Sequence, residues 1–286
     1  MTTTSELDPN SLLVRSYRAI PRHRRMAPRL SITGTPLVVG PEAGAKKVAV
    51  FSHERSGTHF LMNTLAQNFG YISNPWWNLD YEQGINFHAP GYLLHYFLQV
   101  DDQPILNVLK SHHAAPFLFD IIDYLADQFR LFYIVRDPRD TMVSYWKFVL
   151  RNPYDEGPET STAGEFARAA PRGAMLRYQK EQAHTVVHRW QLHVEGWLAV
   201  AENLGPERLM VVRYEDLNRE FERTLATVAA YLDRPLGEPV RPARDRSVVG
   251  VGAGLSGVYG DHLDDEDLAF FRDAVGETMV RLGFEP

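Results

Sequence analysis

Three short stretches place basic, hydroxyl and imidazole side chains directly after apolar runs. Residues 51–61 read FSHERSGTHFL after the run KKVAVF, residues 105–117 read ILNVLKSHHAAPF, and residues 131–148 read LFYIVRDPRDTMVSYWKF. Side chains of these types can hold anions and transfer protons. If the three runs are strands of one sheet, the spacing predicts a shared anion site with an acid–base group at its edge.

The first stretch has the shape of a phosphate-binding loop. Unsatisfied N–H groups and the dipole at a helix N-terminus attract anions, and Gly57 permits a tight turn. Arg55 adds a permanently charged fork, and Ser56, Thr58 and His59 add side-chain donors. The Gly-x4-Gly-Lys-Ser/Thr spacing of an ATP-type loop is missing. An ordinary strand–turn–helix with a surface arginine explains this segment equally well when it is taken alone.

The second and third stretches add a candidate base and a second anion site. A histidine near its free pKa can accept a proton at neutral pH, and Lys110 can stabilise charge beside it. Because adjacent residues of a strand point to opposite faces, only one of His112 and His113 should serve. Arg136 and Ser144 could hold a second phosphate; the alternative is a structural ion pair of Arg136 with Asp137 or Asp140.

The elements that would position these residues alternate between strand and helix. Strands are expected at 48–52, 105–109, 131–135 and 209–213, and helices at 58–69, 116–128, 140–150, 184–204, 217–232 and 264–282. Asp140 is the expected N-cap of the helix that carries Ser144. The alternation predicts an α/β fold with a central parallel sheet flanked by helices, in which ligands bind at the carboxyl ends of the strands.

Composition narrows the function classes. The chain of 286 residues has 44% hydrophobic residues, a net charge of −6 and no cysteine. The negative charge argues against a general nucleic-acid binder, and the lack of cysteine excludes disulfides and thiolate metal sites. No apolar run predicts a membrane span or a signal peptide, so we expect a cytoplasmic protein. Residues 1–30 are expected to be a partly disordered extension, and 31–286 a single domain with a mobile cap near 152–173.

The order of the three motifs resembles that of the sulfotransferases that use 3′-phosphoadenosine 5′-phosphosulfate (PAPS). The family's first loop reads Pro-Lys-Ser-Gly-Thr-Thr-Trp and its third motif reads Arg-Asn-Pro-Lys-Asp-x-x-x-Ser-Tyr. The chain has RSGTHF, KSHH and RDPRDTMVSYW in the corresponding order, and VVRYEDL at 211–217 is also similar to the family. The resemblance covers residues 46–150 and 207–236 and implies a P-loop-like three-layer sandwich.

The resemblance also implies a role for each matching residue. It makes His112 the general base, assisted by Lys110 and Arg55, in sulfuryl transfer to a hydroxyl, or less favourably an amine, of a small-molecule acceptor. The 5′-phosphosulfate would be held by Arg55, Ser56, Gly57, Thr58 and His59. The adenine would lie against Phe60 and Tyr214, and the 3′-phosphate against Arg136 and Ser144. No metal is required.

Two features depart from the family pattern. In its Arg-Lys-Gly near the C-terminus, Gly252 and Ala253 replace the two basic residues, so Arg244 or Arg246 could substitute in binding the 3′-phosphate. The glycine of that motif is matched by Gly254, which the resemblance makes a cofactor-binding residue. The C-terminal dimer signature is not recognisable, which leaves the oligomeric state open. The aromatic stretch 74–97 could line the acceptor pocket or simply belong to the core.

Two other functions remain as alternatives. A P-loop-type nucleotide kinase would use Asp137 to bind magnesium, and a non-catalytic module would bind the nucleotide without transferring anything. GAGLSG at 252–257 matches a dinucleotide-binding pattern, but only one helix follows it, so we interpret it as a chance match. His184 and His188 lie one helical turn apart, and we interpret them as structural because no third metal ligand is evident.

Overall fold

A single sheet of five parallel strands organises the protein. The computed structural model describes residues 45–81, 89–102, 105–152, 157–243 and 256–286, so the expected N-terminal extension lies outside the described residues. The strands follow the order β2-β3-β1-β4-β5, and every neighbouring pair is parallel. Their bounds are β1 Lys47–Ser52, β2 Ile72–Asn78, β3 Asn107–Ser111, β4 Phe129–Val135 and β5 Leu209–Arg213.

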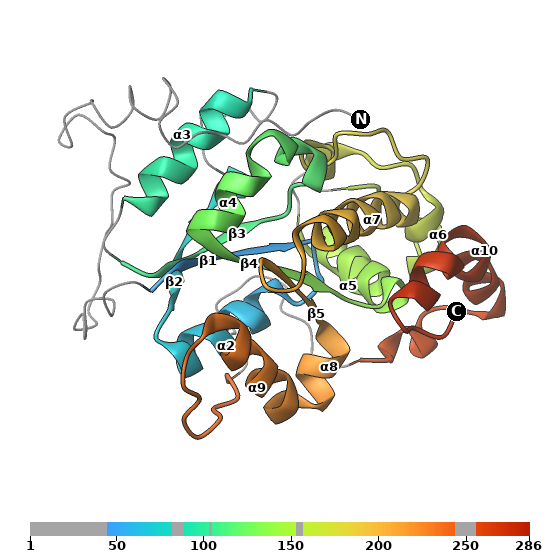
Figure 1. Ribbon diagram of the computed structural model, residues 1–286. Coiled ribbons are helices and arrows are strands. Elements are labelled where there is room, and N and C mark those ends of the chain that lie inside the picture. Colours follow the sequence, from blue (N-terminus) through green and yellow to red (C-terminus); the bar gives the residue numbers. More distant parts are fainter. Residues whose placement is uncertain (1–44, 82–88, 103–104, 153–156, 244–255) are drawn as a thin grey trace.

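Helices cover both faces of this sheet (Figure 1). One face carries α3 (Pro90–Asp101), α4 (Ile122–Gln128) and α7 (Val186–Leu204), and the other carries α2 (Thr58–Phe69), α8 (Tyr214–Arg219) and α9 (Phe221–Leu232). Parallel strands are buried on both sides, which explains why the strand sequences are almost continuously apolar. The three-layer α/β architecture expected from the alternation of elements is confirmed.

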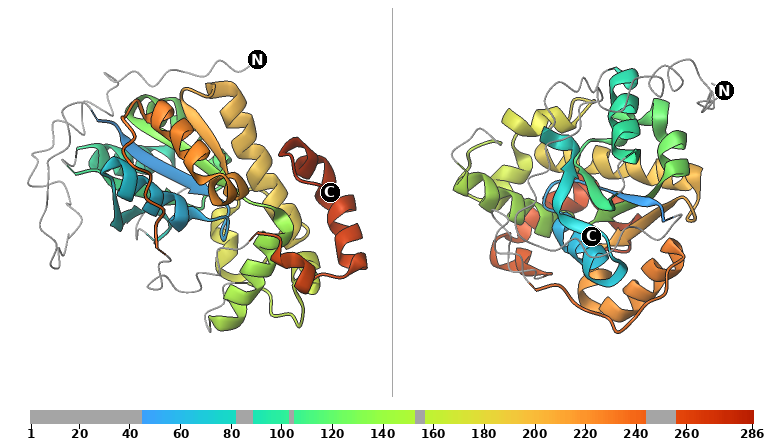
Figure 2. Two further views of the ribbon diagram at one scale, coloured as in Figure 1. Left: turned by 90° about the horizontal axis from the view of Figure 1, so that it is seen from below. Right: turned by 90° about the vertical axis from the view of Figure 1, so that its left-hand side faces the viewer.

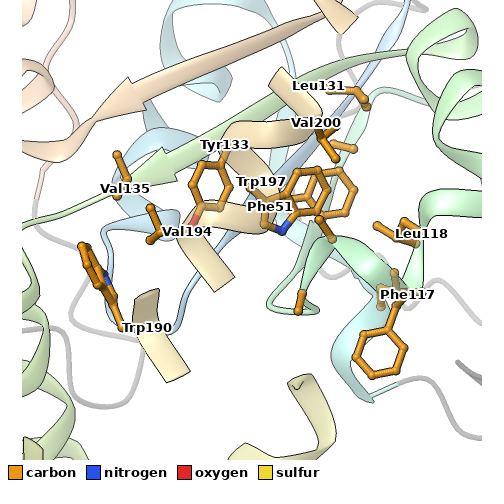
Figure 3. Packing of buried hydrophobic residues seen from close by; sticks show 14 of the residues in the cluster. Phe51, Phe117, Leu118, Leu131, Tyr133, Val135, Trp190, Val194, Trp197 and Val200 are labelled. Atoms are coloured by element: carbon orange, nitrogen blue, oxygen red, sulfur yellow. The ribbon is translucent and has the colours of Figure 1, made fainter. Parts of the chain in front are cut away.

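Alternation along β1 separates two hydrophobic cores. Ala49 and Phe51 face the α7 side, whereas Val48 and Val50 face α2 and α9. On the α7 side, Phe51 stacks on Trp197 with ring centroids 4.3 Å apart (Figure 3). This packing fixes α7 against the centre of the sheet and close to the carboxyl end of β1.

Three further helices gather on the side to which the strands point (Figure 2). They are α5 (Pro138–Arg151), α6 (Ala163–Arg168) and α10 (Asp265–Arg281). A capping box of Thr162 and Glu165 begins α6, whose Phe166 is fully buried. The region expected to be a mobile cap therefore contains a packed helix, and its mobility stays a prediction.

Several expected elements have different bounds in the structure. Helices α2 and α9 end as expected at Phe69 and Leu232, but α9 begins only at Phe221, after the separate helix α8. The helix expected at 116–128 is divided into η3 (Ala115–Phe117), η4 (Phe119–Ile121) and α4. The elements β2 and α3 were not expected, because the aromatic residues of 74–97 carry no clear period.

No helix among the described residues is both long enough and apolar enough to span a membrane.

Candidate nucleotide and active site

All three motifs lie at the carboxyl ends of the central strands β3, β1 and β4. Ser52 ends β1, Ser111 ends β3 and Val135 ends β4, and these strands are direct neighbours in the sheet. The residues that follow them therefore converge on one edge, which is where parallel α/β sheets bind ligands.

The loop after β1 is shaped by two residues with left-handed backbone. Gly57 has φ +96° and Arg55 has φ +66°, a conformation that is uncommon for a residue with a side chain. A Cβ placed on Gly57 would lie 2.3 Å from Cδ2 of Tyr214, so only glycine fits beneath that ring. No side chain caps the N-terminus of α2, where Gly57 is the N-cap. The helix start is thus open to an external anion.

Hydroxyl side chains lie within this loop and directly beside it. The Ser52 and Thr58 hydroxyls lie 2.6 Å apart. The Ser56 hydroxyl is buried and has no hydrogen-bond partner among the described residues. A buried polar group without a partner is costly, and a phosphate oxygen would satisfy it. His59, by contrast, packs edge-on against Trp76, with ring centroids 4.9 Å apart.

Arg55 and Arg136 place two guanidinium groups at the same end of α5. Arg55 Nε donates to Ser144 Oγ at 3.2 Å, and Arg136 Nη1 donates to the Arg55 carbonyl at 3.4 Å. Burial, together with the charge of Arg136, lowers the pKa of Arg55 to about 10. Two neighbouring cations that are poorly solvated favour an anion between them. The structure thus brings together Arg55, Arg136 and Ser144.

Asp140 is not the N-cap of α5. That position is taken by Asp137, whose side chain accepts from Arg139 N and pairs with Arg139 Nη2 at 2.7 Å. Asp140 instead accepts from the amides of Gly257 and Tyr259, at 2.7 and 3.1 Å. Arg136 Nη2 lies 3.6 Å from Asp140, so the ion pair considered as an alternative is present at long range. Asp137, which a kinase would need for magnesium, is engaged by Arg139.

Aromatic rings lie beside the loop where the resemblance places an adenine. The rings of Phe60 and Tyr214 meet edge to face at 6.1 Å, and Phe60 lies near Phe221 at 6.3 Å. Arg136 stacks over Tyr214 at 4.6 Å, and Arg241 lies over Phe221 at 4.8 Å. Phe60 and Tyr214, both selected from the sequence, therefore border the same loop. Gly254, Arg244 and Arg246 lie outside the described residues.

His112 lies directly beside the loop. Its Nδ1 lies 2.9 Å from the Ser52 carbonyl and 3.1 Å from the Ser52 hydroxyl. In the tautomer that donates from Nδ1 to the carbonyl, Nε2 keeps its lone pair. Burial and the charge of Lys110 lower the pKa of His112 to about 4, partly opposed by Asp80. The imidazole is therefore neutral at physiological pH, which is the form required of a base.

His113 is more deeply buried than His112, although both imidazoles lie near Asp80 and Tyr178. Its side chain is 1% exposed against 14% for His112, and its Nδ1 lies 3.0 Å from the Ser111 hydroxyl. It also packs edge-on against Phe117. Only His112 of the pair remains accessible.

Asp80 is a site residue that the sequence reasoning missed. It lies in η2 (Leu79–Tyr81), immediately after β2, and its side chain is fully buried. Lys110 Nζ donates to Asp80 Oδ2 at 2.5 Å, and the amide of His112 donates to Oδ1 at 2.7 Å. Burial alone would raise the pKa of Asp80, but Lys110 and the histidines hold it well below its usual value. The only signal in the sequence was an acidic residue after an aromatic run.

A second buried network supports the loop from below. Arg189 of α7 donates to Glu54 Oε1 at 2.7 Å, and the Tyr145 hydroxyl donates to the same oxygen at 3.0 Å. Although burial opposes ionisation, Arg189 and His53 hold the pKa of Glu54 well below its usual range. His193 of α7 contacts the His112 carbonyl through Nε2 at 3.1 Å. The loop and the end of β3 are therefore both attached to α7.

The pair His184 and His188 shows no metal-site geometry. His188 interacts with Thr185, the N-cap of α7, with Nδ1 2.8 Å from the threonine hydroxyl. Within the described ranges, no cluster of three or more potential metal ligands is found.

Comparison with known families settles the classification. The model of the sulfotransferase domain family matches residues 45–249, which is most of the chain. The chain belongs to the sulfotransferase family. The matched span contains the loop after β1, Lys110, His112, Arg136, Ser144 and Tyr214.

Named relatives are distant and match only in part. The chain is 26% identical over 115 residues to a 3-alpha-hydroxysteroid sulfotransferase of Cavia porcellus, covering 40% of this chain and 34% of the relative. It is 23% identical over 139 residues to sulfotransferase 2B1 of Mus musculus, covering 48% of this chain and 36% of that protein. The aligned part thus spans about a third of these relatives.

Solved structures share the fold over a longer range. A crystal structure of mouse sulfotransferase SULT7A1 complexed with PAP has a TM-score of 0.56 and 18% identity, and the match covers 83% of this chain and 86% of that one. Its fold is the P-loop-like three-layer sandwich implied by the resemblance.

Proposed function

We propose that this protein transfers a sulfuryl group from PAPS to a hydroxyl of a small-molecule acceptor, with His112 as the general base. One observation carries the proposal: Ser52 connects the anion loop with the histidine. Its hydroxyl lies 2.6 Å from that of Thr58, and its carbonyl lies 2.9 Å from His112 Nδ1. A base held this close to the loop can reach an acceptor aligned with the bound phosphosulfate.

The chemistry follows from the placement of charge. As the acceptor oxygen attacks sulfur, its proton passes to His112 Nε2, and the bond from sulfur to the bridging oxygen breaks. The products are a sulfate ester and 3′-phosphoadenosine 5′-phosphate (PAP). Arg55, Lys110 and the amides of the loop would stabilise the charge that develops on the departing phosphate. Arg136 and Ser144 would hold the 3′-phosphate, and Phe60 and Tyr214 the adenine.

The class of acceptor is supported by chemistry and by relatives. A fold neighbour, retinol dehydratase, was crystallised with retinol and PAP and has a TM-score of 0.56 at 17% identity, over 82% of this chain and 81% of that one. A small apolar alcohol or phenol is therefore the first acceptor class to test. The net charge of −6 disfavours a polyanionic glycan.

The decisive experiment compares nucleotides and then acceptors. Calorimetry should give tighter binding for PAP than for ATP, because only PAP offers a 3′-phosphate to Arg136 and Ser144. Labelled PAPS should then transfer sulfur to some member of a panel of alcohols, phenols and amines without added magnesium. Tighter ATP binding, or activity that requires magnesium, would favour the kinase alternative. PAP binding without any transfer would favour the non-catalytic module.

A further inference from the structure

The side chain of Asp80 makes close polar contacts with two of the proposed catalytic groups. A single carboxylate accepts from Lys110 Nζ at 2.5 Å through one oxygen and from the His112 amide at 2.7 Å through the other. The same Oδ2 lies 3.8 Å from His112 Nε2. Lys110 lies in β3 and His112 follows directly after it, whereas Asp80 comes from η2, which follows the neighbouring strand β2.

The surroundings of Asp80 make these contacts strong. The side chain is fully buried, so its charge is poorly screened by water and its bonds to charged donors gain strength. The cationic and titratable groups that face it are Lys110, His112 and His113, the last with Nδ1 at 3.6 Å. One buried carboxylate thus contacts both Lys110 and His112, the two groups that the proposed reaction uses.

We infer that Asp80 is a positioning residue for the transfer reaction, which fixes the Lys110 ammonium and His112 and stabilises the imidazolium formed at Nε2. The inference rests on the proposed function. When His112 takes the acceptor proton, the new positive charge appears 3.8 Å from the Asp80 carboxylate. The hydrogen bond from the His112 amide to Asp80 fixes the backbone that carries the imidazole. The ion pair with Asp80 holds the Lys110 ammonium beside the same carboxylate.

The inference distinguishes Asp80 from the base itself. Both carboxylate oxygens are already occupied by donors, Lys110 Nζ and the His112 amide. His112 Nε2 is therefore the better proton acceptor of the two groups. Burial and Lys110 lower the pKa of His112, whereas Asp80 and Glu54 raise it; the neighbouring His53 is another titratable group that interacts with it. Removal of the Asp80 carboxylate should make the imidazole a weaker base.

The test is the Asp80→Asn variant, with its steady-state pH profile measured beside the wild type from pH 3 to 9, so that the range includes the acid limb expected near pH 4. Asparagine keeps the size of the side chain but loses the charge. We expect the plateau of kcat to fall by about 10-fold or more, which is the lower range for a disturbed acid–base step. We also expect the acid limb of the profile to move to lower pH, because the imidazolium loses its counter-charge. A merely structural lesion would lower the plateau and leave the limb in place.

Three controls complete the design. Asp80→Glu should recover part of kcat and of the position of the acid limb. Asp123→Asn, which removes a partly exposed carboxylate paired with Arg208, should leave both unchanged. Calorimetry with PAP should give Asp80→Asn an affinity within about 3-fold of the wild type, since the polar contacts of the Asp80 side chain within the described residues are with Lys110, His112 and His113 and not with the loop.

Loss of one partner could unfold the variant, because Lys110 would be left buried without its counter-ion. In that case Lys110→Met is compared with Asp80→Asn/Lys110→Met, in which both charges are gone. The double variant should again show the lower kcat and the displaced acid limb. An unchanged limb in either comparison would overturn the inference, as would full loss of turnover in Asp80→Asn while His112→Ala stays active. A wild type that transfers sulfur to no acceptor would instead refute the proposed function, and the inference with it.

Discussion

The ring of Tyr214 lies so close over Gly57 that any side chain at this position would overlap it. A Cβ on Gly57 would be 2.3 Å from Tyr214 Cδ2, and the backbone there has φ +96°. The loop after β1 and the start of α8 are therefore packed in direct contact. This contact joins the two segments that we assign to the phosphosulfate and to the adenine.

Gly57→Ala should damage this arrangement. The left-handed backbone alone costs an alanine about 1–2 kcal/mol, and Tyr214 must also move away. We expect the free energy of unfolding to fall by at least about 1 kcal/mol and the affinity for PAP by about 10-fold, measured by urea denaturation and calorimetry. Gly237→Ala is the matched control, since a Cβ at Gly237 would meet no atom within 4 Å. Equal effects of the two substitutions would contradict the proposed contact.

His112→Ala tests the assignment of the base. Turnover should fall by about 10²–10⁴-fold, while the affinity for PAP changes little, because the imidazole contacts Ser52 and not the helix start. Single-turnover assays with labelled PAPS give the rate, and calorimetry gives the affinity. His184→Ala, at an exposed position, serves as the control. Normal turnover in a folded His112→Ala protein would remove His112 from the mechanism.

The buried pair of Glu54 and Arg189 should be intolerant of change on one side only. Arg189→Met leaves the Glu54 carboxylate buried without its cation, so we expect a loss of about 3–5 kcal/mol in the free energy of unfolding. The double variant Glu54→Gln/Arg189→Met should recover part of this loss. Arg223→Gln, which breaks an exposed pair with Glu220, should cost at most about 1 kcal/mol. A similar cost for both arginines would argue against the buried network.

Stability should decline on acidification before the carboxylates titrate. Burial lowers the pKa of both His53 and His112 to about 4, against about 6.5 in an unfolded chain. A lowered folded-state pKa stabilises the fold fully above pH 6.5, and this contribution is lost as the pH falls towards 4. Between pH 7 and 5, each histidine should reduce the free energy of unfolding by roughly 2 kcal/mol.

Urea denaturation at several pH values checks this slope. His53→Gln should show a flatter dependence between pH 7 and 5 than the wild type, whatever its absolute stability. His184→Gln should retain the slope of the wild type, because His184 is exposed. A slope that His53→Gln leaves unchanged would show that this histidine is not buried in its neutral form.

The sequence predicted the bounds of a helix well where a single residue, such as a glycine, determines the backbone conformation at its end. Helix α2 begins after Gly57 and ends before Gly70, both in left-handed conformation, and the two glycines punctuate the sequence clearly. The region 116–128 behaved differently. Its apolar residues fit a helical period, but Ile121 and Leu118 serve as breaks between short helical turns that pack on the sheet. Such tertiary packing cannot be predicted from the local pattern of apolar residues.

The candidate site likewise contains residues that could be predicted from the sequence and one that could not. Lys110, His112, Arg136 and Ser144 could be found because each follows an apolar run at a fixed spacing. Asp80 could not, since its role depends on β2 lying beside β3, a pairing that the sequence did not reveal. The choice of Asp140 as N-cap failed because Asp137, three residues earlier, can cap the helix and pair with Arg139 at once.

The two bonds from Asp140 to the amides of Gly257 and Tyr259 connect distant parts of the chain. The helix that carries Ser144 is thereby tied to the segment leading into α10, which in turn binds α7 through Thr278 and Glu195. We therefore expect that shortening the protein from its carboxyl terminus would weaken the proposed 3′-phosphate site. A chimera that exchanges acceptor regions between relatives should therefore keep Asp140 together with the segment that contains Gly257 and Tyr259.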